Sequence, residues 1–382
     1  MVENSMKRIP LAKPILGDEE LQKIREVFDS GWILNGPRVK EFENKFKEYI
    51  GCKHAIAVSS CTAGMDLALK ALNVEGGEVI LPAFNFIAAG IAVLQNNAKP
   101  VFTDVDEKTC NIDPEKLKEK INKKTKAILL CHYAGLSANM DPILEIANDY
   151  NIPIVEDAAH ALGSEYKGRK VGTLGDITVF SFGPVKMITT GMGGMVTTDN
   201  GDIDNKIRVL RSYGMNKSAY EREVSNSSQP WNYSIKMLGH NFRMTDIAAA
   251  IGLIQLSKLD LFIEKRRNFA DMLTKELKTI NEIEPPIEPQ EYKHAYLYYV
   301  IKIKDGLRNK LAKHMLKKGI GVSVHWDPPL HLHNLMRKYG YKEGDFPITE
   351  KLSKEVLTLP MGPHLTFDDI EYIVDCIKEV FK

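Results

Sequence analysis

Lys186 is the residue of this sequence best suited to covalent chemistry. It ends the run SFGPVK (181–186), which overlaps the end of an apolar stretch at 177–182, and the glycine-rich run TTGMGG (189–194) follows it. A lysine held in an apolar turn loses its proton readily and can then attack a carbonyl group. A lysine taken by itself more often extends its amine into solvent, so the case for Lys186 depends on its neighbours in the fold.

Asp157 and His160 follow a second apolar stretch, at 153–156, in the run EDAAH (156–160). A carboxylate at the end of a buried strand is costly unless it has a cationic partner. Asp157 could equally cap the following loop, and a histidine such as His160 is, on its own, more often structural than functional. Whether either residue is functional therefore depends on which residues lie beside it in the fold.

The run SSCTAG (59–64) follows a third apolar stretch, at 55–58, and opens a helix. Free N–H groups at a helix N-terminus favour an anion by about 0.3–1 kcal/mol per charge, although a serine or threonine there also serves as an ordinary N-cap. An anion cradle, a carboxylate and a lysine on successive strand ends are together what pyridoxal phosphate (PLP) requires. Phe86 could stack on the cofactor ring or pack in the core.

The elements that position these residues alternate between short apolar stretches and helix-length segments from residue 51 to about 200. Continuously apolar strands separated by helices predict a mainly parallel sheet covered on both faces. In such sheets, chemistry collects at the carboxyl ends of the strands. The predicted strands are 55–58, 78–81, 99–105, 127–130, 153–156, 177–182 and 194–198. The predicted helices between them are 63–72, 87–95, 114–121 and 141–150.

The rest of the chain predicts a second, smaller unit. Residues 1–50 predict helices and a turn at 35–37, and the amphipathic stretch 245–278 predicts one long helix or two consecutive ones. The tail predicts strands at 297–303 and 321–325 and helices at 310–318 and 367–381. We therefore divide the chain into a large domain, residues 1–255, and a small C-terminal α+β domain, residues 256–382.

Composition excludes several classes of protein. The 382 residues include 51 Lys and Arg against 50 Asp and Glu, a net charge of +1, so no bulk field attracts nucleic acid or a membrane surface. The longest mostly apolar stretch, 83–94, is too short to span a bilayer, and the first ten residues lack the apolar core of a signal peptide. The five cysteines lack metal-ligand spacing, so we expect reduced thiols, no metal and a cytoplasmic location.

The sequence resembles the DegT family of PLP-dependent sugar aminotransferases, which has the fold of aspartate aminotransferase. The resemblance covers almost the whole chain and many motifs in order: SGWILNGPRVKEFE, AVSSCTAGMDLAL, GGEVILPAFNF, PVFTDVD, TKAILLCHYAGLSANMDPI, IVEDAAHALGSEYKGRKVGTLGDITVFSF, LGHNFRMTDIAAAIGLIQL, VSVHW, PPLH and LTLPMGPHLT. It implies an α/β fold with a large, mainly parallel seven-stranded sheet flanked by helices, and a smaller α+β domain.

The resemblance also implies a role for each matched residue. Lys186 is the Schiff-base lysine and proton shuttle, Asp157 pairs with the pyridinium nitrogen, His160 contacts the cofactor's phenolic oxygen, and Phe86 stacks on its ring. The phosphate cradle contains Cys61, Thr62 and Ser181, and Asn241 reaches the phosphate of a neighbouring subunit, which implies a homodimer with shared sites. The acceptor side of the pocket contains Tyr213, His325 and Trp326.

Four positions depart from the family pattern. Cys61 stands where glycine or alanine is usual, Gly183 replaces a bulky residue, Met187 replaces an asparagine and Met192 replaces the glutamate of a TGEGG turn. Three of these flank Lys186, so they bear on the identity of the acceptor. None removes a group that amino transfer needs.

We expect an aminotransferase that moves an amino group from an amino acid, most plausibly glutamate, to a keto sugar, with pyridoxamine phosphate as the intermediate form of the cofactor. The acceptor we expect is a nucleotide-linked 4-keto sugar, because the HYAG and EDAAH motifs resemble those of members with such substrates. Two other functions stay open: a PLP-dependent dehydratase or epimerase of keto sugars, and a non-catalytic regulator that holds the cofactor. Met187 and Met192 motivate the latter.

Overall fold

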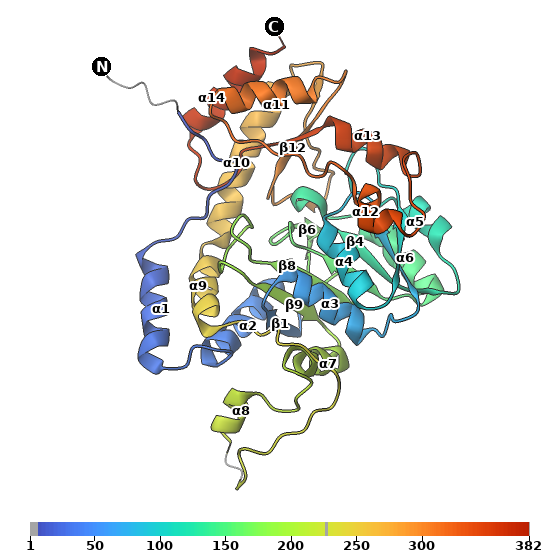
Figure 1. Cartoon of the computed structure of the whole chain (residues 1–382). Helices are drawn as coiled ribbons and strands as arrows, with labels where there is room; N and C mark the ends of the chain where they lie inside the picture. The colour runs from blue at the N-terminus through green and yellow to red at the C-terminus, as the bar shows by residue number, and fades with distance from the viewer. Residues whose placement is uncertain (1–6, 226–227, 382) are drawn as a thin grey trace.

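A seven-stranded sheet forms the centre of the molecule in this computed structural model, which describes residues 7–225 and 228–381 (Figure 1). The strand order is β1-β9-β8-β5-β4-β2-β3, and within this sheet β9 alone runs antiparallel to its neighbours. The predicted mainly parallel sheet is therefore confirmed. Its strands are β1 (His54–Val58), β2 (Glu78–Pro82), β3 (Lys99–Thr103), β4 (Thr125–Cys131), β5 (Ile154–Asp157), β8 (Ile177–Ser181) and β9 (Gly194–Thr198).

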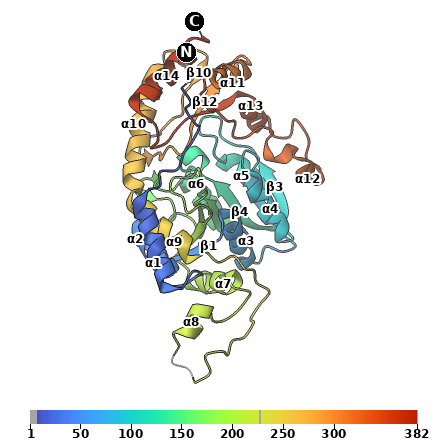
Figure 2. The ribbon, with the colours of Figure 1, turned by 60° about the vertical axis from the view of Figure 1, so that its left-hand side comes forward.

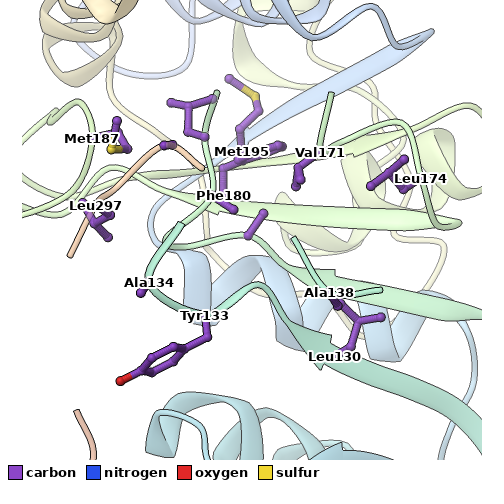
Figure 3. Close-up of a cluster of buried hydrophobic side chains, with 14 of the residues drawn as sticks. Leu130, Tyr133, Ala134, Ala138, Val171, Leu174, Phe180, Met187, Met195 and Leu297 are labelled. Atoms are coloured by element: carbon purple, nitrogen blue, oxygen red, sulfur yellow. The ribbon is translucent and has the colours of Figure 1, made fainter. Parts of the chain in front are cut away.

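Successive residues of these strands enter two different cores, because side chains alternate across a sheet. Phe180 of β8 belongs to one cluster and Val179 to the other. Figure 3 shows part of the first cluster, from Leu130 and Tyr133 past Phe180 to Met187. The helices around the sheet are α2 (Pro37–Ile50), α3 (Cys61–Ala71), α4 (Ile87–Gln95), α5 (Pro114–Lys120), α6 (Met140–Tyr150), α7 (Gly201–Arg211) and α9 (Asp246–Ser257).

The C-terminal part builds a separate three-stranded sheet in the order β10-β12-β13 around a third apolar cluster. Ile9 joins this cluster and pairs with Ile320, so both ends of the described chain lie at the same end of the molecule (Figures 1 and 2). The domain division at residue 255 falls inside α9 and stays a prediction. The elements of this part are α10 (Leu259–Leu277), β10 (Ile283–Glu284), β12 (Tyr299–Ile303), α11 (Arg308–Lys317), α13 (Pro347–Glu355), β13 (Val356–Leu359) and α14 (Phe367–Lys378).

Two of the predictions for this part need comment. The stretch 245–278 forms two helices, α9 and α10, with Lys258 between them, so the second of the two alternatives is confirmed. The predicted strand at 321–325 is wrong: among residues 7–225 and 228–381, this stretch forms one isolated bridge, between Ser323 and Thr358, and no strand. The chain turns away after that bridge, so that Trp326 packs against Phe84 and Tyr133 in loops of the large sheet, while His325 stacks on Tyr298 directly before β12.

The smaller elements complete the described chain: α1 (Asp18–Ser30), β6 (Glu165–Tyr166), β7 (Arg169–Lys170), α8 (Ala219–Glu223), β11 (Tyr292–Lys293) and α12 (Asn334–Arg337). Figure 1 shows α8 on an extension that projects from the body of the molecule below α7. Over the described ranges, no helix combines the length and apolar character that crossing a membrane would require.

Asp246 ties the start of α2 to the start of α9. Its carboxylate accepts hydrogen bonds from the backbone N–H groups of Gly36 at 2.7 Å, Arg38 at 3.1 Å and Val39 at 3.2 Å. These are N–H groups that the first turn of a helix cannot satisfy internally. The predicted turn at 35–37 is thus held in place by a residue more than two hundred positions later.

Candidate active site

A cavity of about 380 Å³ opens at the carboxyl edge of the large sheet. Nine of the eleven predicted site residues line it: Cys61, Thr62, Phe86, Asp157, His160, Ser181, Lys186, His325 and Trp326. They come from the ends of β5 and β8, from segments that follow β1, β2, β5 and β8, and from the loop that follows α11. These residues lie together near the carboxyl ends of the strands, as the sequence predicts.

Lys186 lies in the turn between β8 and β9, where its backbone N–H donates to the carbonyl of Gly183 at 3.1 Å. Its Nζ lies 6.0 Å from the centre of the Tyr298 ring. No ion pair or side-chain hydrogen bond ties this amine down within the described chain, unlike many of the other lysines. The amine is therefore available to react with a molecule bound in the cavity.

Asp157 ends β5 and is buried. Its Oδ1 accepts from the backbone N–H of Ala159 at 3.0 Å and lies 3.8 Å from the Cys61 sulfur, and no donor to Oδ2 is present among residues 7–225 and 228–381. Burial raises the pKa of this carboxyl, against the smaller lowering effects of the Ala159 hydrogen bond and of Lys186. Asp157 thus lacks the cationic partner that a buried carboxylate needs, and a bound pyridinium nitrogen would supply it.

The N-terminus of α3 lies where the sequence predicts a phosphate cradle. Ser60 caps the helix, with its Oγ accepting from the N–H of Ala63 at 3.1 Å. The N–H groups of Cys61 and Thr62 have no acceptor in the described structure, so they are free to bind a phosphate. Gly194 is required beside this turn, because a Cβ there would lie 2.7 Å from the Cys61 nitrogen.

Aromatic side chains form another part of the cavity lining. Trp326 stacks on His160 with ring centres 5.6 Å apart, and His325 stacks on Tyr298 at 4.4 Å. Burial, aided by Lys186, lowers the pKa of His160 well below its ordinary value and that of His325 to about 4. Both histidines are therefore neutral at physiological pH, and the Nδ1 of His160 is buried without a partner among the described residues.

Phe86 lies at the rim of the cavity, just before α4, with 52% of its surface exposed. Its position at the rim leaves the ring accessible to a molecule in the cavity, and this fits a ring that stacks on a bound cofactor. The carboxylate, the free amine, the free N–H groups and the exposed ring together fit PLP.

Tyr213 and Asn241 lie outside the cavity of their own chain. Asn241 is exposed and pairs with Ser212, and the next residue, Phe242, accepts a hydrogen bond from Ser59 at 2.8 Å. Tyr213 is 44% exposed, and the guanidinium of Arg243 lies 5.0 Å from its ring centre.

Among the cavity-lining residues that sequence reasoning did not select, Asn85 and Tyr298 carry large polar side chains. Asn85 stands directly before Phe86, so its position next to a candidate residue was the available signal. Tyr298 carries no such signal, because the fold alone brings the start of β12 to the carboxyl edge of the large sheet.

Comparisons with known proteins identify the family of the chain. Residues 14–378 match the DegT/DnrJ/EryC1/StrS aminotransferase family. The chain is 38% identical over 389 aligned positions to the spore coat polysaccharide biosynthesis protein SpsC of Bacillus subtilis, covering 100% of this chain and 99% of SpsC.

Two solved structures are similar over nearly their whole length, both at 28% identity. PseC of Helicobacter pylori, an aminotransferase involved in the biosynthesis of pseudoaminic acid, superposes with a TM-score of 0.90 over 98% of this chain and 99% of PseC. Spr1654 of Streptococcus pneumoniae, in its PLP form, superposes with a TM-score of 0.90 over 98% of each chain, and it is also known in a pyridoxamine phosphate form. The chain therefore belongs to the DegT/DnrJ/EryC1/StrS family of PLP-dependent sugar aminotransferases.

Proposed function

We propose that this enzyme transfers the amino group of glutamate to a keto sugar carried on a nucleotide, at C4 of the sugar. The observation that carries the proposal is that one cavity contains both Lys186 and Asp157. Within the described residues, the Lys186 amine forms no ion pair or side-chain hydrogen bond, and the buried Asp157 carboxylate has no cationic partner. When bound, PLP supplies a carbonyl that takes up an amino group and a ring that withdraws electrons. The residues of this chain hold it and move the protons.

The Lys186 amine is the base of the reaction in this proposal. With PLP bound, this amine would hold the cofactor, and it would take and return the proton of the substrate's reacting carbon. The Asp157 carboxylate keeps the pyridine nitrogen protonated, and the free N–H groups of Cys61 and Thr62, with Ser181, bind the phosphate. Neutral His160 holds the phenolic oxygen without adding a second positive charge beside Lys186.

A keto-sugar acceptor is supported by the known relatives and by the shape of the site. SpsC is a spore coat polysaccharide biosynthesis protein, and PseC is an aminotransferase involved in the biosynthesis of pseudoaminic acid. His325 and Trp326 extend the cavity beyond Lys186 and would contact the sugar. A nucleotide attached to the sugar would extend out of the cavity, past Tyr213 or onto a second subunit.

We further propose a homodimer with shared sites, located in the cytoplasm. Large apolar side chains are exposed on α1 and on the extension around α8, namely Leu21, Phe28, Trp231, Tyr233, Ile235 and Leu238. Exposed apolar surface of this extent favours association with another chain. Asn241 is exposed near this extension, which supports its contact with the phosphate in a partner's site.

A two-stage assay tests the function. Purified enzyme with PLP is mixed with glutamate alone, and the loss of the lysine-bound cofactor's absorbance and the release of 2-oxoglutarate are measured. Nucleotide-linked keto sugars are then screened for recovery of the absorbance. A dehydratase or epimerase would not need the first stage. A cofactor whose absorbance no amino acid changes would favour a non-catalytic role.

A further inference from the structure

Asn85 is a buried side chain whose hydrogen bonding is incomplete. It lies in the loop between β2 and α4, is 2% exposed and lines the cavity beside Phe86. Its Oδ1 accepts from the backbone N–H of Phe86 at 2.7 Å, which settles the orientation of the amide. The Nδ2 group then carries two N–H donors, and no acceptor for them exists among the described residues.

The other buried asparagines of the described chain show that this is unusual. The Nδ2 of Asn96 donates to three oxygens, at 2.8–3.1 Å, and that of Asn111 donates to two carbonyls, at 3.1 and 3.2 Å. A buried polar group without a partner destabilises a protein. Of these three asparagines, only Asn85 lines the cavity, so a molecule bound there is the partner that completes its hydrogen bonds.

The charges around the cavity indicate what kind of atom this partner is. Glutamate has two carboxylates, yet no arginine in the described chain lines the cavity, and Lys186 is its only cationic side chain. Lys186 is committed to the reaction, and the two histidines are neutral because burial lowers the pKa of each. Within the part of the cavity that one chain builds, neutral N–H donors are therefore the groups that can hold the negative charge of an amino acid.

We propose that Asn85 is a binding residue whose Nδ2 donates to an anionic oxygen of the bound molecule, the carboxylate of the amino donor. This inference rests on the proposed function. The phenolic oxygen of the cofactor has the same chemistry and is the other possible source, so the experiment must separate the two.

Asn85→Asp is the decisive variant, because one carboxylate oxygen can still accept from Phe86 while the other faces the ligand as an acceptor. Cofactor affinity is measured by absorbance titration without substrate. The apparent dissociation constant of glutamate is measured from the concentration dependence of single-turnover absorbance loss. We expect the glutamate constant to rise about tenfold or more, the effect of losing a hydrogen bond to a charged group, with cofactor affinity unchanged.

A fall in cofactor affinity instead would assign the phenolic oxygen as the partner of Asn85. If both constants stay at the wild-type values, the proposal is wrong. Asn111→Asp is the matched control, because it places a carboxylate at a buried asparagine outside the cavity: it should lower stability and leave both constants unchanged. Asn85→Ala is measured if Asn85→Asp does not fold. If glutamate fails to react with the wild-type enzyme, the proposed function fails, whereas the cofactor titration still tests Asn85.

Discussion

Glu156 and Asp157 are adjacent buried carboxylates with opposite hydrogen bonding. Glu156 accepts from His132 Nε2, Thr178 Oγ1 and the N–H of Gly175, each at 2.7 Å. Burial alone would raise the pKa of Glu156, but these hydrogen bonds outweigh it and the pKa is lowered. Asp157 has one N–H donor, and burial raises its pKa. The first carboxylate is satisfied by the protein, and the second is left for a cationic ligand.

Replacing Asp157 by asparagine should therefore separate stability from function. Because burial raises the pKa of Asp157, its protonated carboxyl stabilises the folded state at low pH. This stabilisation is lost as the pH rises through the pKa of Asp157 in the folded state. Cofactor-free Asp157→Asn should unfold at a higher temperature than wild type at pH 7, and this margin should shrink as the pH falls toward the ordinary aspartate pKa of about 3.9. Thermal unfolding across this pH range measures it.

The same variant should slow the glutamate half-reaction. The lost charge-assisted bond to the pyridinium is worth about 1.5–3 kcal/mol, or roughly ten- to a hundredfold in rate. Glu156→Gln serves as the comparison, since it alters the neighbouring carboxylate outside the cavity and should lower stability more than rate. An unchanged half-reaction in Asp157→Asn would mean that this carboxylate does not contact the cofactor.

Lys186→Ala should abolish amino transfer, because one side chain provides both the covalent anchor and the proton carrier. The cofactor should still bind, since Asp157 and the N–H groups of Cys61 and Thr62 are intact. Production of 2-oxoglutarate from glutamate is the measurement, with fluorescence of bound cofactor as the check on loading. Turnover at the wild-type rate would overturn the assignment of Lys186.

Much of this site could be predicted from the sequence because its residues follow strands that are buried on both faces. Those strands read as continuous apolar runs, and their ends mark Asp157, Ser181 and the turn of Cys61. The stretch at 321–325 shows where this reasoning fails: its alternation fits a strand, but pairing with Thr358 at one residue does not make one. The unpaired donor of Asn85 depends on which groups surround it in space, and no sequence pattern reports that.

Gly183→His should change the choice of acceptor and leave the glutamate half-reaction nearly intact. Gly183 does not adopt a left-handed backbone conformation, and a Cβ there would lie 3.7 Å from Lys186 Cγ and 3.8 Å from Ser181 Oγ, which are ordinary contacts. The glycine thus leaves room beside the reactive lysine. Rates with a panel of keto sugars measure the effect, and Gly183→Ala should behave like wild type. Equal losses in both half-reactions would indicate a conformational role for this glycine.

Asp246→Ala should destabilise the fold without a direct effect on the chemistry. The substitution leaves the N–H groups of Gly36, Arg38 and Val39 without their acceptor, and loss of a helix cap costs about 0.5–2 kcal/mol. Denaturant unfolding measures the loss. Asp246→Asn keeps one acceptor oxygen and should lose less, so equal losses in the two variants would argue against the capping role.

Mixing two inactive variants tests the shared-site dimer. Lys186→Ala and Asn241→Asp chains, each weak as a homodimer, are unfolded together and reassembled. If Asn241 contacts the phosphate of the partner's site, a mixed dimer has one site with both substitutions and one with neither, because symmetric interfaces exchange the same residues in both directions. Activity should then return toward one site per dimer.

Asn241 could instead serve its own chain, since the next residue, Phe242, is hydrogen bonded beside the cradle at Ser59. In that arrangement every site of a mixed dimer carries one substitution, and activity stays at the level of the parent variants. Separating the species by charge-tagged chromatography establishes that mixed dimers have formed. Mixed dimers without recovered activity would therefore exclude the shared site, whereas recovery that scales with their fraction would confirm that Asn241 acts across the interface.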